Sequence, residues 1–297
     1  VLFMSEINGI YAASVSIFDS NLNLDINKTI KHAENLIEQG CHGVVIFGST
    51  GQAQLISYDE KLKLIEKLSK SKHKNNFIIG TGLNSLKDTI SLMSFCNSCG
   101  FEKFLVMPPA YYLYGDLEVK RFFYKLLEKV TKCKIILYNF EKLSGYKFSI
   151  ECVVSLNKDH PQRIIGVKDS SYNLYEKLKI NNFSILPGSE TKLLKGLEIG
   201  CSGIITATCN VTASLSRKVY DDFKNNTSQT QNEKLCNVRQ VFDKYNLIAG
   251  IHTYLSEIDA CYKNLIPPCD ILTRKDKEDL FNELKKLNFK INFLKVA

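Results

Sequence analysis

The chain has 297 residues, of which 44% are hydrophobic and 24% are charged, and its formal net charge is +8. This composition is typical of a globular protein with a large core. No apolar run approaches the ~18 residues that a membrane-spanning helix needs, so we expect a cytoplasmic protein without a membrane partner. Most basic residues are lysines spread along helical segments without interleaved aromatic residues, which predicts solvated helix faces and argues against a nucleic-acid partner.

Short apolar segments rich in β-branched residues alternate with segments of helical periodicity over most of the chain. In the first helical segment Ile30, Ala33 and Leu36 recur at helical spacing, and Gly40 follows where a C-terminal cap belongs. Gly100 ends the third helical segment in the same way. The expected strands are residues 9–18, 42–47, 76–80, 103–107, 134–138, 163–168, 183–188 and 203–207.

Nearly continuous apolar strands that alternate with helices predict a parallel sheet covered on both faces. Eight such units within residues 8–224 favour an α/β fold closed into a (β/α)8 TIM barrel, with an open doubly wound sheet as the alternative. The rest of the chain, residues 225–297, is purely helical in pattern, and we expect it to form a C-terminal helical extension packed on the barrel. Its expected helices are residues 231–249, 253–264 and 275–287.

The ten cysteines are scattered along the chain, mostly inside apolar segments, which is typical of reduced, buried thiol groups. Cys96 and Cys99 have the spacing of a redox or zinc motif, but the sequence supplies neither a second such pair nor a nearby histidine. Packing at the end of a helix is the interpretation that this pair favours. We therefore expect no metal site.

Two reactive side chains stand at the ends of neighbouring predicted strands. Lys168 closes the sixth strand, and a crowded, poorly solvated barrel mouth suits an amine that attacks a carbonyl group. Tyr138 closes the fifth strand, where its hydroxyl group could relay protons for that chemistry. Each residue alone has a structural alternative, a lysine that reaches solvent and a tyrosine that packs in the core. Together they favour imine chemistry.

A Gly-Ser-Thr-Gly segment, residues 48–51, follows the second predicted strand. Small residues, two hydroxyl groups and exposed backbone N–H groups at a strand-to-helix junction suit a carboxylate or a phosphate. The segment lacks the lysine of a P-loop and the glycine spacing of a dinucleotide-binding motif. We therefore expect no organic cofactor.

Residues 48–51, Tyr138 with Asn139, and Lys168 with the Gly-Val that precedes it together resemble the dihydrodipicolinate synthase and N-acetylneuraminate lyase family of class I pyruvate-dependent aldolases. The similarity runs over residues 8–215. The resemblance implies that Lys168 condenses with the C2 carbonyl group of pyruvate and that Tyr138 donates and accepts protons. It also implies that Thr50 and the neighbouring N–H groups, including that of Gly51, bind the pyruvate carboxylate.

The resemblance also implies an assembly. Ser49 would connect Tyr138 to Tyr111 in a proton relay, and in dihydrodipicolinate synthases the residue that matches Tyr111 enters the site of a neighbouring subunit. We therefore expect a homodimer or a homotetramer. Ile205, on the eighth predicted strand, matches a position whose backbone lines the pyruvate pocket.

The departures from the family pattern concern the second substrate. Leu143 stands where dihydrodipicolinate synthases have an arginine that binds a substrate carboxylate, and Gln52 stands where glutamate is usual. Gly188 and Glu190 reproduce only part of the pocket in which sialate lyases hold a polyol chain. The resemblance thus predicts the pyruvate half of the site and leaves the aldehyde half open.

Three functional hypotheses follow. The first is an aldolase or lyase that joins or releases pyruvate and an aldehyde through an imine on Lys168. The second is a 2-keto-3-deoxy sugar-acid aldolase or dehydratase that uses the same imine. The third, of a different class, is a non-catalytic protein that binds a 2-keto acid as a regulator. The presence of both Lys168 and Tyr138 argues against it, because a binding module needs no amine beside a proton relay.

Overall fold

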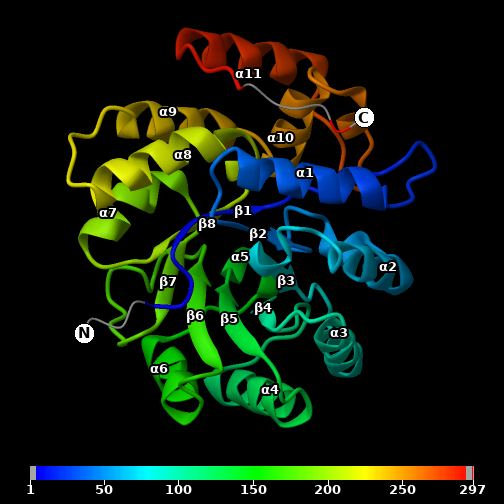
Figure 1. Ribbon diagram of the computed structural model, residues 1–297, viewed down its shortest axis with the longest axis vertical. Coiled ribbons are helices and arrows are strands. Elements are labelled where there is room, and N and C mark those ends of the chain that lie inside the picture. The colour runs from blue at the N-terminus through cyan, green and yellow to red at the C-terminus, as the bar shows by residue number, and fades with distance from the viewer. Residues whose placement is uncertain (1–4, 292–295, 297) are drawn as a thin grey trace.

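The computed structural model describes residues 5–291 and 296, and its centre is a parallel sheet of eight strands (Figure 1). The strand order is β7-β6-β5-β4-β3-β2-β1-β8, so β1 pairs with both β2 and β8. Next to β8, the Ser202 N–H donates to the Ile185 carbonyl group of β7 at 2.9 Å, which closes the circle. The predicted TIM barrel is confirmed, and the open sheet is excluded. The strands are β1 (Gly9–Ala13), β2 (Gly43–Ile46), β3 (Phe77–Gly80), β4 (Lys103–Val106), β5 (Lys134–Asn139), β6 (Ile164–Asp169), β7 (Ser184–Pro187) and β8 (Gly203–Thr206).

Helices follow the strands and cover the outside of the barrel (Figure 1). Side-chain caps fix where several of them begin. Asp25 accepts the Lys28 N–H at the start of the first helix, and Ser57 and Glu60 form a capping box at the start of the second. The helices are α1 (Ile26–Glu38), α2 (Tyr58–Leu68), α3 (Leu86–Ser98), α4 (Asp116–Lys129), α5 (Glu141–Ser144), α6 (Ile150–Asp159), α7 (Leu193–Glu198) and α8 (Cys209–Lys224).

The first strand is shorter than predicted and ends at Ala13. Val15 and Ile17 continue its apolar pattern, but their side chains pack against the C-terminal helices and not inside the barrel. Phe18 then forms an isolated antiparallel bridge with Leu24. The apolar run reflects two different cores, and the sequence pattern does not separate them.

The C-terminal extension, which we define as residues 225–291 with Val296, lies at one end of the molecule (Figure 1). Its helices are α9 (Asn232–Asp243), α10 (Leu247–Ser256) and α11 (Arg274–Lys286). The predicted boundary between its first two helices was wrong, because the helix expected over 231–249 breaks before Asn246. The Asn246 side chain accepts the Ala249 N–H and starts α10, which continues through the predicted gap to Ser256.

A buried polar cluster joins the extension to the barrel. His32 of α1 lies between the Tyr262 hydroxyl group and the Asn210 side chain, with 2.7 Å to each. Asn210 donates from Nδ2 to the carbonyl groups of Ala13 and Ala207, so its Oδ1 accepts and His32 Nε2 carries the hydrogen. Burial lowers the pKa of His32 to about 4, so the histidine is neutral at pH 7.

None of the helices in the described residues is both long and apolar enough to cross a membrane. All ten cysteines are free, and Cys96 is buried in the outer core, as the packing interpretation predicts. Within residues 5–291 and 296, no group of three or more metal-binding side chains comes together.

Candidate active site

Lys168 and Tyr138 lie side by side at the C-terminal end of the barrel. They are register partners on β6 and β5, and the Lys168 Nζ atom stands 4.3 Å from the centroid of the Tyr138 ring. Lys168 is only 3% exposed, yet in the described part of the chain it forms no ion pair with a carboxylate. Its amine is therefore not occupied by a protein group and can meet a molecule in the barrel mouth.

The carboxylate nearest in sequence, Asp169, is used elsewhere. It accepts the backbone N–H groups of Tyr172, Leu174 and Tyr175, each at 2.9 Å, and the Asn139 side-chain amide at 2.8 Å. Burial raises the pKa of Asp169, and these hydrogen bonds oppose that rise. Asp169 therefore holds the loop after β6 in place and does not pair with the neighbouring lysine.

The Tyr138 hydroxyl group lies 2.9 Å from the Ser49 hydroxyl group, and either oxygen can donate. Ser49 and Thr50 belong to the loop after β2, whose tight path depends on Gly51. A Cβ atom on Gly51 would stand 2.9 Å from the Ser14 carbonyl oxygen, and the Gly51 carbonyl group accepts the Ser16 hydroxyl group at 2.7 Å. The predicted contact between Tyr138 and Ser49 thus exists within one chain.

Tyr111 does not reach Ser49 in this chain. It is 90% exposed, has a left-handed backbone (φ 86°), and its ring packs edge-on against Tyr112 with centroids 5.3 Å apart. Leu113 and Leu117 are also highly exposed. The predicted relay therefore ends at Ser49 unless a second chain extends it.

A cavity of about 430 Å³ opens above Lys168. Six of the residues predicted for the site line it: Ser49, Thr50, Tyr138, Leu143, Lys168 and Gly188. Gly51 is buried within the loop after β2 and is not among the lining residues, and Ile205 is buried among the side chains that fill the barrel. The other lining residues include Phe140, Lys142, Ser170, Tyr172, Ala207, Arg239, Asn246 and Ile248.

Glu190 lies behind the cavity wall and is fully buried. Its carboxylate accepts the hydroxyl groups of Thr206 at 2.8 Å, Thr208 at 2.5 Å and Thr212 at 2.8 Å, and it pairs with Arg239 at 2.9 Å. Burial opposes ionisation, but Arg239 and the threonine hydroxyl groups hold the pKa of Glu190 below its usual range. Direct substrate binding by Glu190 stays a prediction, because Arg239 stands in front of it.

The sequence interpretation missed the wall that the C-terminal extension supplies. Arg239 comes from α9, and Asn246 and Ile248 come from the start of α10. No motif in the sequence marks them. The spacing of Arg239 and Asp243 predicts an ordinary ion pair on a helix surface, and only the fold shows that this pair borders the cavity.

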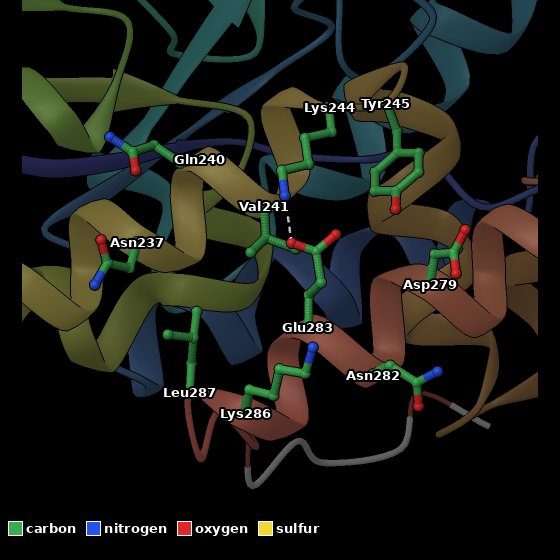
Figure 2. A pocket seen from close by; sticks show the side chains of 10 residues that line it. All are labelled: Asn237, Gln240, Val241, Lys244, Tyr245, Asp279, Asn282, Glu283, Lys286 and Leu287. Carbon is green, nitrogen blue, oxygen red and sulfur yellow. Dashed lines mark hydrogen bonds and ion pairs between the residues drawn. The ribbon is translucent and has the colours of Figure 1, made fainter.

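A further groove, of about 630 Å³, lies between α9 and α11 (Figure 2). Lys244 and Glu283 form an ion pair across it, drawn as the dashed line in Figure 2. The groove shares Tyr245 with the cavity above Lys168 but contains none of the strand-end residues. The groups suited to imine chemistry thus belong to the smaller cavity.

Gln52 connects the loop after β2 to the extension. Its Oε1 atom accepts the Ile266 N–H at 3.1 Å, and its Nε2 atom has no hydrogen-bond partner within the described residues. Gln52 is buried and has a left-handed backbone (φ 56°). The loop that carries Ser49 and Thr50 is therefore anchored by the last part of the chain.

The chain is similar in sequence to several known proteins. The chain is 28% identical to an uncharacterized DapA-like lyase of Chloroflexus aurantiacus, over 74% of this chain and 76% of that protein. It is 27% identical to 4-hydroxy-tetrahydrodipicolinate synthase of Methanopyrus kandleri over 95% and 97% of the two chains. It is also 27% identical to N-acetylneuraminate lyase of Clostridium perfringens over 72% and 75%.

Solved structures share the fold. YagE, a prophage protein of the dihydrodipicolinic acid synthase family from E. coli K12 in complex with pyruvate, matches with a TM-score of 0.86 at 22% identity, over 96% of this chain and all of that chain (100%). Dihydrodipicolinate synthase from Acinetobacter baumannii complexed with pyruvate matches with a TM-score of 0.87 at 23% identity, with the same coverage (96% and 100%). The sequence profile of the Dihydrodipicolinate synthetase family matches residues 6–287. The chain therefore belongs to the dihydrodipicolinate synthetase family.

Proposed function

We propose that this protein is a class I aldolase or lyase that joins or releases pyruvate and an aldehyde through an imine on Lys168. The observation that carries the proposal is the buried Lys168 amine, which has no carboxylate partner in the described residues and lies against Tyr138. An amine in this setting can attack a carbonyl carbon, and a phenol beside it can move protons.

The proposed reaction starts when Lys168 Nζ attacks C2 of pyruvate. Loss of water gives a protonated imine, and removal of a C3 proton gives an enamine. The enamine C3 attacks the aldehyde carbon while Tyr138, hydrogen-bonded to Ser49, delivers a proton to the aldehyde oxygen. Water then hydrolyses the new imine and frees Lys168. Lyase activity is the same sequence in reverse.

The loop after β2 supplies the proposed carboxylate site. Thr50 lines the cavity next to Ser49, and Gly51 fits the tight turn because a Cβ atom there would stand 2.9 Å from the Ser14 carbonyl oxygen. The Gly51 N–H donates to the Gly48 carbonyl group at 3.1 Å within the turn, so the proposal assigns the carboxylate chiefly to Thr50. Two structural relatives are described as pyruvate complexes, which supports pyruvate as the donor substrate.

We further propose that a homodimer or homotetramer completes the site. Tyr111, Tyr112, Leu113 and Leu117 form an exposed apolar patch, and such patches mark interaction surfaces. A second chain on this patch would bring a Tyr111 to the Ser49 of its partner. Sedimentation analysis should therefore give a dimer or larger species, and Tyr111→Asp should shift it toward monomer.

A second candidate on the same imine is a 2-keto-3-deoxy sugar-acid aldolase or dehydratase. The observation that favours it is Leu143, which lines the cavity without a charge where a semialdehyde carboxylate would need a cation. The two activities differ in their products. Release of pyruvate from a 2-keto-3-deoxy sugar acid indicates the aldolase, and release of water alone indicates the dehydratase.

The test is reduction with borohydride in the presence of pyruvate, followed by peptide mass mapping. We expect a pyruvyl adduct on Lys168 and none on Lys103, a lysine at the opposite end of the barrel on β4. Absence of the adduct from Lys168 would show that the proposed function is wrong, including its sugar-acid variant.

A further inference from the structure

The wall of the cavity opposite the β2 loop is built around one arginine. Arg239 is buried, and its guanidinium group is held on two sides. Nη1 donates to Glu190 at 2.9 Å, and Nε donates to Asp243 at 2.8 Å. Nη1 also lies within hydrogen-bond distance of the Gly188 carbonyl group and the Thr208 hydroxyl group. A planar group fixed at two corners has one orientation.

The third nitrogen, Nη2, is different. Among the described residues it has no hydrogen-bond partner, and it belongs to a side chain that lines the cavity. Nη2 is also not enclosed by protein atoms. In this it differs from Arg163 Nε, which likewise has no partner but is buried. Nη2 is therefore the donor that Arg239 has left for a molecule in the cavity.

The charges that contact Arg239 do not favour a substrate carboxylate. One positive charge, on Arg239, contacts two negative charges, on Glu190 and Asp243. A substrate carboxylate placed on Nη2 would be attracted by one charge and repelled by two at slightly longer distance. A hydroxyl or carbonyl oxygen accepts the same hydrogen bond without that repulsion.

Tyr172 forms the adjacent part of the wall and is held there under strain. Its backbone is left-handed (φ 57°), which is unfavourable for a bulky residue, and the Asp169 carboxylate fixes it by accepting its N–H. Burial raises the pKa of its hydroxyl group, and the nearby Arg239 and Ser189 oppose that rise. Tyr172 thus brings a second uncharged donor to the cavity that Arg239 lines.

We propose that Arg239 determines the specificity for the second substrate by donating a hydrogen bond from Nη2 to an uncharged oxygen of the aldehyde, away from its reacting carbon. The inference rests on the proposed pyruvate imine at Lys168. It assigns the chemical class of the aldehyde as hydroxylated and uncharged at this position. Glu190 and Asp243 are positioning residues, because they orient the guanidinium group and offset its charge.

The test compares three aldehydes with pyruvate as the donor: erythrose, which carries hydroxyl groups, butanal, which does not, and succinic semialdehyde, which carries a carboxylate. The wild-type protein should prefer erythrose by kcat/KM. Arg239→Lys keeps a cation for Glu190 but loses the planar fork. It should lower kcat/KM for erythrose by about 10- to 100-fold, the effect of one lost hydrogen bond from a charged donor, and change butanal by less than about threefold.

Asp243→Asn provides the second variant, because the Asp243 side chain is 44% exposed and its replacement does not disturb a core. It removes one negative charge and should raise kcat/KM for succinic semialdehyde on the order of tenfold. Asp221→Asn is the matched control, since Asp221 forms the same helical ion pair with Arg217 on α8, outside the cavity. It should leave the three aldehydes ranked as before.

Borohydride trapping with pyruvate alone distinguishes a failure of the proposed imine at Lys168 from a failure of the proposed role of Arg239. If the wild-type protein forms no pyruvyl adduct on Lys168, the proposed function fails. If the adduct forms in wild type and Arg239→Lys, but the ratio of erythrose to butanal is unchanged, the specificity inference is wrong. It is equally wrong if succinic semialdehyde is the preferred substrate and Lys142→Met, at the cavity rim, abolishes that preference.

Discussion

The two halves of the cavity above Lys168 are built in different ways. The half that contains Ser49, Thr50, Tyr138 and Lys168 comes from the ends of barrel strands, and each side chain is set by strand register or by a short loop. The half around Arg239 depends on α9, a helix of the C-terminal extension, and Arg239 is held there by ion pairs with Glu190 and Asp243. The difference indicates that the barrel supplies the proposed chemistry, whereas the extension selects what the chemistry acts on.

The strongest test of the strand-end half is Lys168→Ala. We expect turnover to fall below detection with every aldehyde, because the proposed imine needs the Lys168 amine, while the circular dichroism spectrum stays that of the wild type. Lys103→Ala, a strand lysine at the other end of the barrel, should keep full activity. Retained turnover in Lys168→Ala would remove the distinction between the two halves.

Tyr138→Phe should have the next largest effect. Loss of its hydroxyl group removes the proton relay with Ser49, so kcat should fall by about 10²- to 10⁴-fold, as for other lost general acid–base groups. The measurement is steady-state kinetics, with Tyr124→Phe as control, because Tyr124 lies on α4 outside the cavity and its hydroxyl group donates to Asp159 at 2.6 Å. Equal rates for the two variants would remove Tyr138 from the mechanism.

Glu190→Ala tests the half that the extension supplies. It leaves Arg239 buried without its main partner, and breaking a buried pair costs about 3–5 kcal/mol in the free energy of unfolding. Urea denaturation measures this loss. Asp221→Ala breaks an ion pair that is partly exposed, and it should cost no more than about 1 kcal/mol. A similar small cost for Glu190→Ala would mean that the wall needs no internal ion pair.

The smallest effect expected of a single residue depends on pH and concerns the contact between the barrel and the extension. Burial lowers the pKa of both His32 and His252 to about 4, below the 6.5 of an exposed histidine. The unfolded chain therefore binds protons that the folded chain rejects as the pH falls from 6.5 to 4. The free energy of unfolding is therefore highest above pH 6.5. Each histidine should lower it by about 2 kcal/mol when the pH falls to 5.

Denaturation curves at pH 8, 6.5 and 5 measure this loss of unfolding free energy with falling pH. His32→Gln should remove about half of the loss. A wild-type protein equally stable at pH 8 and pH 5 would contradict the buried, neutral histidines at this joint.

The sequence predicted the fold and one half of the site because both depend on local signals. Apolar strands and helical periodicity mark the eight units, and the strand-end positions of Lys168 and Tyr138 follow from those units. Their proximity is confirmed by the 4.3 Å between the Lys168 amine and the Tyr138 ring centroid.

The other half could not be predicted, since its position depends on how the extension docks. Arg239 and Asn246 acquire their place in the cavity from packing between segments far apart in sequence. Asn246 also shows how a local signal was overlooked. Its side chain caps α10, but the apolar pattern continues across the break and suggested one uninterrupted helix.

The shared core between Val15, Ile17 and Val211 of the barrel and the helices of the extension has a consequence for how the protein is made. A ribosome releases these barrel residues long before α9, α10 and α11 emerge. Until then an apolar face stays uncovered, and the strand-end groups stand in an open mouth without the Arg239 wall. The cavity above Lys168 can therefore be completed only after α9 and α10 emerge, and a nascent chain that stalls after α8 would be a target for chaperones.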